Sequence, residues 1–402
     1  MASASVQAKV ETIHRTFDRW IWTENWWLLD VVCGSILGNY VLNGPAIWLA
    51  LVAPSGTAKT VILDSLRGLP GAYGIGGYNE QTFASGMIRS KKKKVGILEL
   101  MTDRQEDGKS FSDGVKFLLM KDFGSVFAKR SHVKNELLTE MRDIYDGHVE
   151  KAWGTGAILD WYGRVGAVVV STNVWDRQVA DFTQMGERFL LWREWWQGNN
   201  RIGDAAQKQV FMQRDMELKE AMNLLATYDV PEDVDVSANW SWNFELGKMV
   251  GLARCPITRN HYTREVEWKP EPEEGARLAL QFGQLEKGLM VFRGEEDATN
   301  DQIRYPIMRV AFSCLPKIRY EILGTLPPEG LRTSEVGEAI DFKRKVTERV
   351  LEDLRDLKIL AKTETGLWMP HPQAEKFCEM AREVWNTIPG AGAPIHQEEA
   401  SE

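Results

Sequence analysis

The stretch Ala53-Pro-Ser-Gly-Thr-Ala-Lys-Thr60 decides the fold, because it lies between an apolar run (AIWLALVA, 46–53) and a helical pattern (VILDSLRG, 61–68). A phosphate-binding loop needs this context, since its backbone N–H groups and the start of a helix must converge on an anion. In such a loop Lys59 reaches the β- and γ-phosphates and Thr60 holds Mg²⁺. The stretch therefore predicts a site for ATP and Mg²⁺. Its predicted cofactor-binding residues are Pro54, Ser55, Gly56, Thr57, Ala58, Lys59 and Thr60.

The loop departs from the pattern G-x-x-x-x-G-K-[ST] at both glycines. Ala53 and Ala58 stand at those positions, and Gly56 remains inside the loop. A coincidental turn is the alternative interpretation. Strand, loop and helix follow one another in the required order, which favours the nucleotide site.

Four further apolar runs follow the loop or precede the next helical stretches, at 94–100, 115–122, 165–173 and 187–193. Short runs rich in branched residues that alternate with helical patterns are typical of strands buried on both faces. The sequence therefore predicts an α/β fold with a mostly parallel sheet covered by helices on both sides.

Two of these runs end in side chains suited to phosphate chemistry. FLLMKDF, residues 117–123, ends in the single acid Asp122, which can bind Mg²⁺ through water and orient an attacking water. A competing run, GILEL at 96–100, carries Glu99 and offers the same chemistry. The run 166–173 ends in Asn173, which is either a turn residue or a hydrogen-bond donor to the γ-phosphate or the attacking water.

The ordered motifs LVAPSGTAKT, MKDF, VVVSTN and GERF, across residues 46–193, resemble the AAA+ core of the minichromosome maintenance (MCM) helicases and their short relatives in phages and mobile elements. The segment 275–311 is similar to the helical lid of that family. The resemblance implies a P-loop ATPase that assembles into a ring or spiral, typically a hexamer, and acts on DNA in replication. Its partners would be further copies of itself, DNA and a replication or mobile-element protein.

The resemblance also implies roles for individual residues. Asp122 takes the position of the catalytic acid, and Asn173 resembles the sensor-1 residue. Arg188 resembles the arginine finger that reaches the γ-phosphate of a neighbouring subunit, and Arg277 corresponds to the sensor-2 residue of the lid. The family's acidic pair is replaced by Lys121 and Asp122 here, which makes fast hydrolysis uncertain.

The pattern divides the chain into five parts. Residues 1–45 form a helical segment whose aromatic cluster (Phe17, Trp20, Trp22, Trp26 and Trp27) indicates packing, with base stacking as the alternative. The ATPase core covers 46–200, and a helical linker and lid cover 201–315. Residues 316–372 predict a winged-helix domain, because three helical stretches precede two short strands. Residues 373–402 predict a last helix and a disordered tail.

Two regions are candidates for nucleic-acid contact. The Gly-rich segment 145–166 predicts a hairpin with Lys151 and Arg164 as phosphate contacts, as in MCM-like proteins. The basic run 91–94 either lines a channel or faces water.

The third helix of the predicted winged helix is the other candidate. It presents Lys343, Arg344 and Lys345, together with Arg349, to DNA if it enters a major groove. The same helix carries Glu348 and Glu352, so docking of a protein is the alternative.

Composition limits the remaining possibilities. Lys and Arg total 49 against 57 for Asp and Glu, a formal charge of −8, so any nucleic-acid contact must come from local patches. The four cysteines lack the spacing of a zinc site or a disulfide scaffold, which predicts free thiols in a reducing compartment. No apolar run approaches the length of a membrane helix, so we expect a cytoplasmic protein without membrane contact.

Three functions are compatible with these patterns. The first is an ATPase stimulated by nucleic acid, which translocates on DNA or unwinds it. The second is an ATP-switched assembly or loading factor with slow or no hydrolysis, which Lys121 favours. The third is a structural protein with a relic nucleotide site, which requires the ordered motifs to be accidental.

Overall fold

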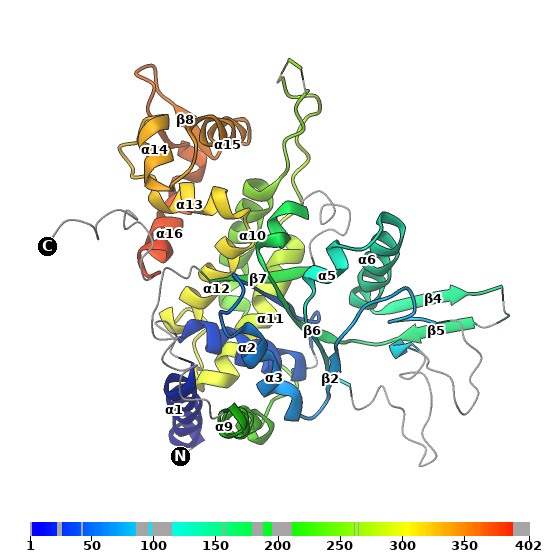
Figure 1. The fold of residues 1–402 in the computed structure, drawn as a ribbon. Coiled ribbons are helices and arrows are strands. Elements are labelled where there is room, and N and C mark those ends of the chain that lie inside the picture. The colour runs from blue at the N-terminus through cyan, green and yellow to red at the C-terminus, as the bar shows by residue number, and fades with distance from the viewer. Residues whose placement is uncertain are drawn as a thin grey trace, which may run out of the picture.

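The computed structural model describes residues 2–21, 26–41, 43–85, 96–98, 115–154, 156, 158–178, 188–194, 211–260, 262–263 and 265–388. A central sheet lies among helices, and a smaller helical unit with its own short strands follows toward the C-terminus (Figure 1). No helix among the described residues is both long and apolar enough to cross a membrane.

The central sheet has five parallel strands. They are β1 (Trp48–Val52), β2 (Ala72–Ile75), β3 (Phe117–Met120), β6 (Gly166–Ser171) and β7 (Phe189–Arg193). Their order across the sheet is β2-β3-β6-β1-β7, so β1 lies between β6 and β7. The predicted parallel α/β sheet is thus confirmed, and β1, β3, β6 and β7 fall in four of the predicted runs.

The strand predicted at 94–100 is wrong over its described part. Ile97 and Leu98 are helical, and their N–H groups donate to the carbonyls of Thr82 and Phe83. The edge of the sheet beside β3 is occupied instead by β2, which the sequence did not reveal because only Ile75 of its four residues is buried. Glu99, the competing acid, lies outside the described residues.

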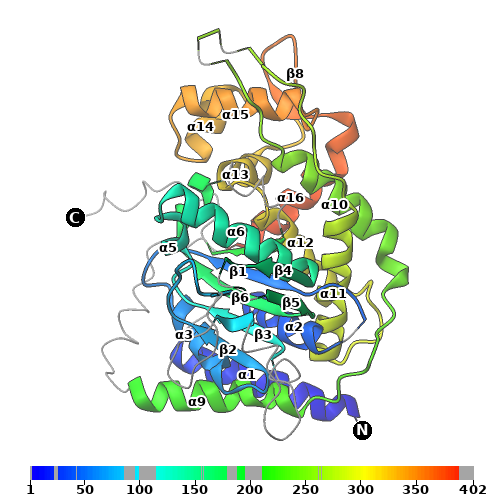
Figure 2. The same ribbon diagram turned by 90° about the vertical axis from the view of Figure 1, so that its right-hand side faces the viewer.

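Helices lie on both sides of the sheet. Those of the core are α3 (Lys59–Ser65), α5 (Gly124–Phe127) and α6 (Ser131–Asp146), and the short 3₁₀ helices η1 (Leu66–Gly68) and η3 (Asn173–Gln178) complete it. Figure 2 shows α3 and α6 on opposite sides of the sheet. Helix α9 (Phe211–Asn223) packs on α3, and α1 (Ala2–Trp20) packs on α9.

Three further helices are α10 (Trp240–Arg254), α11 (Ala276–Arg293) and α12 (Asp301–Ser313), with the 3₁₀ turns η4 (Leu224–Thr227) and η5 (Ser237–Asn239) before them. Helix α11 packs along α2 (Trp27–Tyr40) at a glycine contact. A Cβ atom at Gly288 would lie 1.8 Å from the carbonyl oxygen of Gly34 and 2.6 Å from the nitrogen of Gly38. Only glycine at position 288 permits this approach of the two backbones.

The aromatic residues of the N-terminal segment serve packing, as predicted. Phe17 is fully buried, Trp26 stacks on His14 with ring centroids 4.7 Å apart, and Trp27 stacks on Tyr305 at 5.5 Å. Trp22 lies outside the described residues. The four cysteines are free and buried.

The C-terminal unit has the helix and strand order predicted for 316–369. It comprises α13 (Lys317–Thr325), α14 (Thr333–Ala339), α15 (Arg344–Asp356), the antiparallel pair β8 (Leu360–Lys362) and β9 (Trp368–Pro370), η6 (Pro372–Ala374) and α16 (Glu375–Asn386). Leu331 adds a bridge to Trp368. The predicted hairpin before β6 also forms, from β4 (His148–Ala152) and β5 (Ile158–Tyr162).

A buried polar cluster joins α10, α11 and α12. The Glu286 side chain is inaccessible to solvent and accepts hydrogen bonds from Nδ2 of Asn239 (3.0 Å) and Nδ2 of Asn243 (2.7 Å). Arg304 donates to Oδ1 of Asn239 at 2.7 Å. Burial raises the pKa of Glu286 to about 7, although these hydrogen bonds and Arg304 act to lower it.

Glu286→Gln should therefore remove a pH dependence of stability. A raised pKa means that the folded state holds the proton more tightly, so the free energy of unfolding of the wild type falls as pH rises from 4.5 to about 7. The amide stays neutral, and the variant should gain up to about 3 kcal/mol over the wild type between pH 5 and 8. Urea unfolding across this range measures the difference. A constant difference would contradict the assignment, and the exposed control Glu296→Gln should show none.

Candidate functional site

The loop 53–60 leaves the carboxyl end of β1 and enters α3, as the sequence predicted. Its lysine is folded into the loop: Nζ of Lys59 donates to the carbonyl oxygens of Ala53 (2.7 Å) and Pro54 (2.5 Å) and to Oγ1 of Thr57 (3.1 Å). Burial lowers the pKa of Lys59 to about 8. The Thr60 side chain is exposed and makes no hydrogen bond with any described residue.

Two residues of the loop have left-handed backbone conformations. Gly56 has φ +85°, and Ala58 has φ 57° and ψ 4°. This conformation costs a residue with a Cβ about 1–2 kcal/mol, and glycine adopts it freely. Ala58 stands where the common pattern has glycine, so the strain is a direct consequence of the substitution.

The strand register brings the predicted polar residues to the same edge of the sheet. Met120 lies opposite Val169, so Asp122, two residues on, is level with Ser171, the last residue of β6. Ser171 in turn lies opposite Val52, the last residue of β1. Two strand spacings of about 4.8 Å place Asp122 roughly 10 Å from the loop across the sheet.

Both predicted polar groups at this edge are exposed. Asn173 begins η3 directly after β6, and its side chain makes no hydrogen bond with any described residue. Asp122 is also exposed and has φ 46°, a second strained backbone at this edge. Backbone strain in residues other than glycine is often retained at functional sites, so Ala58 and Asp122 are candidates for a functional role.

Lys121 stands where the usual pattern has a second acid, and its side chain pairs with α3. Its Nζ lies 2.7 Å from Oδ2 of Asp64 on α3, and Arg67 binds the other carboxylate oxygen at 2.6 Å. Burial alone would raise the pKa of Asp64, but hydrogen bonds from Lys121 and Arg67 lower it. The three residues tie the end of β3 to α3. The sequence did not reveal Asp64 because its partner is distant along the chain.

Arg188 lies at the amino ends of the strands, the opposite end of the sheet from the loop. It precedes Phe189, which pairs with Trp48 at the start of β1, about 16 Å along the strand from the loop. Its guanidinium forms a two-pronged ion pair with Asp146, through Nε (3.1 Å) and Nη2 (2.6 Å). The side chain is only 7% exposed. Any contact with a neighbouring subunit would first require this ion pair to open.

Arg277 lies at the same edge as Arg188. It is one turn before Gln281, whose amide donates to the hydroxyl of Tyr145 (2.9 Å) and the carbonyl of Arg188 (2.7 Å). Burial raises the pKa of Tyr145 to about 12, against the lowering influence of Gln281, Arg277 and Arg188. The Arg277 side chain is 40% exposed and pairs with Glu273. Neither arginine can reach phosphates on the loop of its own chain.

The two hairpin candidates for nucleic-acid contact have structural partners. Lys151 forms ion pairs with Glu136 (3.0 Å) and Glu140 of α6. Arg164 donates to the main-chain carbonyls of Gly38 and Asn39, in the last turn of α2, and to those of Gly44 and Pro45, in the connection to β1. Arg164 thus satisfies carbonyls in the last turn of that helix, and its predicted contact with phosphates stays a prediction. Residues 91–94 lie outside the described part of the chain.

The basic residues at the start of α15, unlike Lys151 and Arg164, have no structural partner among the described residues. Lys343, Arg344, Lys345 and Arg349 are exposed and form no ion pair with any described residue. Beside them, the side chains of Phe342 and Val346 are 45% and 39% exposed.

A further acid lies at the carboxyl edge, at the end of β7. Glu194 accepts a hydrogen bond from Nε1 of Trp192 (2.8 Å), and its own N–H donates to the carbonyl of Val52. A small pocket between β1, β7 and α2 is lined by Trp192, Glu194, Thr57 and Lys59 among others. The position of Glu194 directly after a buried strand is the feature by which the sequence could have identified it.

The sequence matches no protein-family model, and no curated protein matches it significantly.

The strain at Ala58 predicts an asymmetry between the two loop positions. Ala58→Gly should relieve about 1 kcal/mol of backbone strain and lose at most a similar amount through the more flexible unfolded chain, so stability stays equal or rises. Gly56→Ala should lower the free energy of unfolding by about 1–2 kcal/mol, although a Cβ there meets no atom within 4 Å. Urea unfolding of both variants measures this, and equal destabilisation by both would contradict it.

Proposed function

We propose that the chain is a nucleotide-binding AAA+-type ATPase that assembles with copies of itself and acts on DNA. One observation carries the proposal: the loop 53–60, with Lys59 inside it, shares the carboxyl edge of a parallel sheet with Asp122 and Asn173. Ligands of open α/β sheets bind at that edge. The ordered motifs that resemble the MCM core support the finer assignments.

The residues at the loop fit ATP and Mg²⁺. The Nζ of Lys59 donates hydrogen bonds to loop carbonyls. In the bound state a phosphate oxygen would replace these carbonyls as the acceptor. The exposed hydroxyl of Thr60 and the exposed carboxylate of Asp122 are oxygen groups of the kind that Mg²⁺ prefers. Bound Mg²⁺ would offset negative charge on the phosphates. Asp122 would hold a water through its carboxylate, and Asn173 would orient it by a hydrogen bond.

The positions of the arginines support assembly, in a ring or spiral and by resemblance a hexamer. The described residues place Lys59, Thr60 and Asp122 at one edge and Arg277 at the other, so a complete site needs a second chain. Arg277 fits the role of the cation from the neighbour better than Arg188, because it is 40% exposed while Arg188 is held by Asp146.

The C-terminal unit supports the DNA-directed part of the proposal. We interpret residues 316–372 as a winged helix whose free cations, Lys343, Arg344 and Lys345, meet nucleic acid. A second candidate function, an ATP-switched assembly factor, is favoured by Lys121. Its ion pair with Asp64 leaves Asp122 as the one acid of the usual pair, which is compatible with slow hydrolysis.

Lys59 variants test the nucleotide site. Lys59→Ala should abolish ATP binding, since the ammonium is the main charge facing the phosphates. In the wild type, ATP affinity should fall about tenfold between pH 8 and 9.5, because Lys59, with a pKa of about 8, loses its proton there. Lys59→Arg keeps its charge, so any affinity it retains should not change with pH. Calorimetric titration with ATP gives these affinities, and unchanged binding by Lys59→Ala would refute the site.

Mixing inactive variants tests the shared site. Arg277→Ala should bind ATP normally yet lose about 10³-fold or more in turnover, the loss typical of arginine fingers. Mixed with Lys59→Ala, it should recover part of the activity, because some interfaces then pair an intact loop with an intact arginine. Lys248→Ala, an exposed cation on α10, is the matched control.

The same series with Arg188→Ala decides between the two arginines. Recovery with Arg188→Ala but full turnover by Arg277→Ala would restore Arg188 as the finger. A mixture that stays inactive although the variants assemble together would show that no site is shared.

A further inference from the structure

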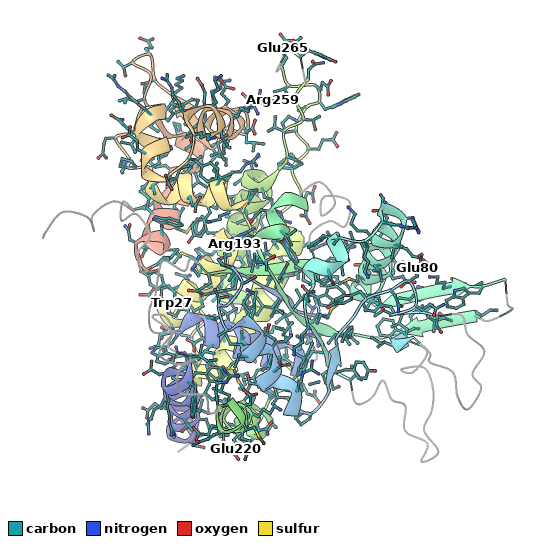
Figure 3. The ribbon with its side chains drawn as sticks, in the orientation of Figure 1. Trp27, Glu80, Arg193, Glu220, Arg259 and Glu265 are labelled. Atoms are coloured by element: carbon teal, nitrogen blue, oxygen red, sulfur yellow. The ribbon has the colours of Figure 1, made fainter. Side chains whose placement is uncertain are left out.

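An open groove of about 460 Å³ lies between α15 and the polar segment that follows α10. One wall is α15, through Lys345, Glu348, Arg349, Glu352 and Asp353, and the other wall includes Ile257 and Arg259. Figure 1 shows the segment rising beside α15. In Figure 3, Arg259 lies near α15 and Glu265 lies at the far end of the segment.

The segment folds back on itself as an antiparallel pair. Arg259 bridges to Val266, and the N–H of Glu267 donates to the carbonyl of Thr258 at 2.9 Å. Residues directly opposite each other share a face, and faces alternate along a strand. This register places Trp268 opposite Ile257.

By this register Trp268 shares the face of Ile257 and Arg259, although it is not one of the residues that line the groove. Ile257 and Arg259, which share its face, both line the groove. The Trp268 side chain is nevertheless 73% exposed. A tryptophan this exposed beside a groove offers an unoccupied stacking surface.

This arrangement bears on how α15 can meet nucleic acid. Its buried residues are Thr347, Leu351 and Leu354, so at 100° per residue Lys345 and Arg349 lie on the opposite, outward face. The paired segment stands over that face, held by ion pairs from Arg259 to Asp353 and Asp356, both 2.7 Å. A major groove about 12 Å wide admits one helix, not a helix with a second wall beside it.

The charges of the groove suit one extended strand. Lys345 and Arg349, one helical turn apart, have no ion-pair partner among the described residues, and neither do Glu348 and Glu352. Cations bind phosphates, and carboxylates accept hydrogen bonds from the exocyclic amino groups of cytosine and adenine. Two free cations, two free acceptors and a stacking surface match the parts of a single-stranded nucleic acid.

We infer that the groove between α15 and the paired residues 257–260 and 265–268 binds single-stranded nucleic acid. Phosphates lie on Lys345 and Arg349, a base stacks on Trp268, and Glu348 and Glu352 favour bases with amino groups over thymine. The inference rests on the proposed function and names its substrate class. It makes the paired segment the second wall of the binding site, beside α15.

Fluorescence anisotropy with labelled 20-mers tests the inference on the full chain. Oligo(dC) should bind more tightly than oligo(dT), and a duplex should bind more weakly than oligo(dC). Trp268→Ala should weaken oligo(dC) about 5- to 150-fold, the range for one stacked base, while Trp268→Phe retains most of the affinity. Trp240→Ala, 45% exposed on α10, is the matched control and should have no effect.

Charge variants separate the roles of the cations and the carboxylates of α15. Lys345→Ala with Arg349→Ala should lower the slope of log affinity against log salt by about 1.4, or 0.7 for each lost phosphate contact. Glu348→Ala with Glu352→Ala should abolish the preference for oligo(dC) over oligo(dT).

Three results would overturn the inference. One is equal binding of oligo(dC) by wild type and Trp268→Ala. Another is tighter binding of duplex that is lost in the Lys345 and Arg349 variant, which would mean that α15 enters a major groove after all. The last is no binding of any nucleic acid, as expected if the groove takes a protein segment. ATP binding that depends on Lys59, measured in parallel, shows whether the proposed nucleotide site stands in each case.

Discussion

The pairing of β1 with β6 on one side and β7 on the other is the constraint on which the rest of the structure depends. Val52 lies opposite both Ser171 and Arg193, so three strands end at one level. Everything that follows those ends, including the loop, η3 and Glu194, gathers at the same edge. Parallel strands make this possible, because their crossover connections return each chain to the same end of the sheet.

The same register separates two groups of charged residues. Lys59 and Asp122 follow the carboxyl ends of their strands, whereas Arg188 precedes β7 and Arg277 packs near it through Gln281. A single chain thus has Lys59 and Asp122 at one end of the sheet and Arg188 and Arg277 at the other. Copies arranged head to tail would bring unlike edges together, which is the geometry of rings and spirals.

Sequence patterns predicted what depends on neighbours along the chain. Apolar runs located β1, β3, β6 and β7. The loop could be predicted because its strand and its helix adjoin it in the sequence. Partners distant in sequence were not predictable: Lys151 was expected at phosphates but meets acids of α6, and Arg164 was expected there but binds the end of α2. The run at 94–100 was misread because a short apolar run fits a helix as well as a strand.

The glycine contact between α2 and α11 has a mechanical consequence. Two backbones in contact at Gly34 and Gly288 have no side chains between them, so a relative shift of α2 and α11 has to move backbone rather than side chains. A packed route through α9 and α1 connects α11 to α3, and α3 follows directly on the loop 53–60. A shift of α3 therefore has a packed path to α11 and α2 that does not pass through the sheet.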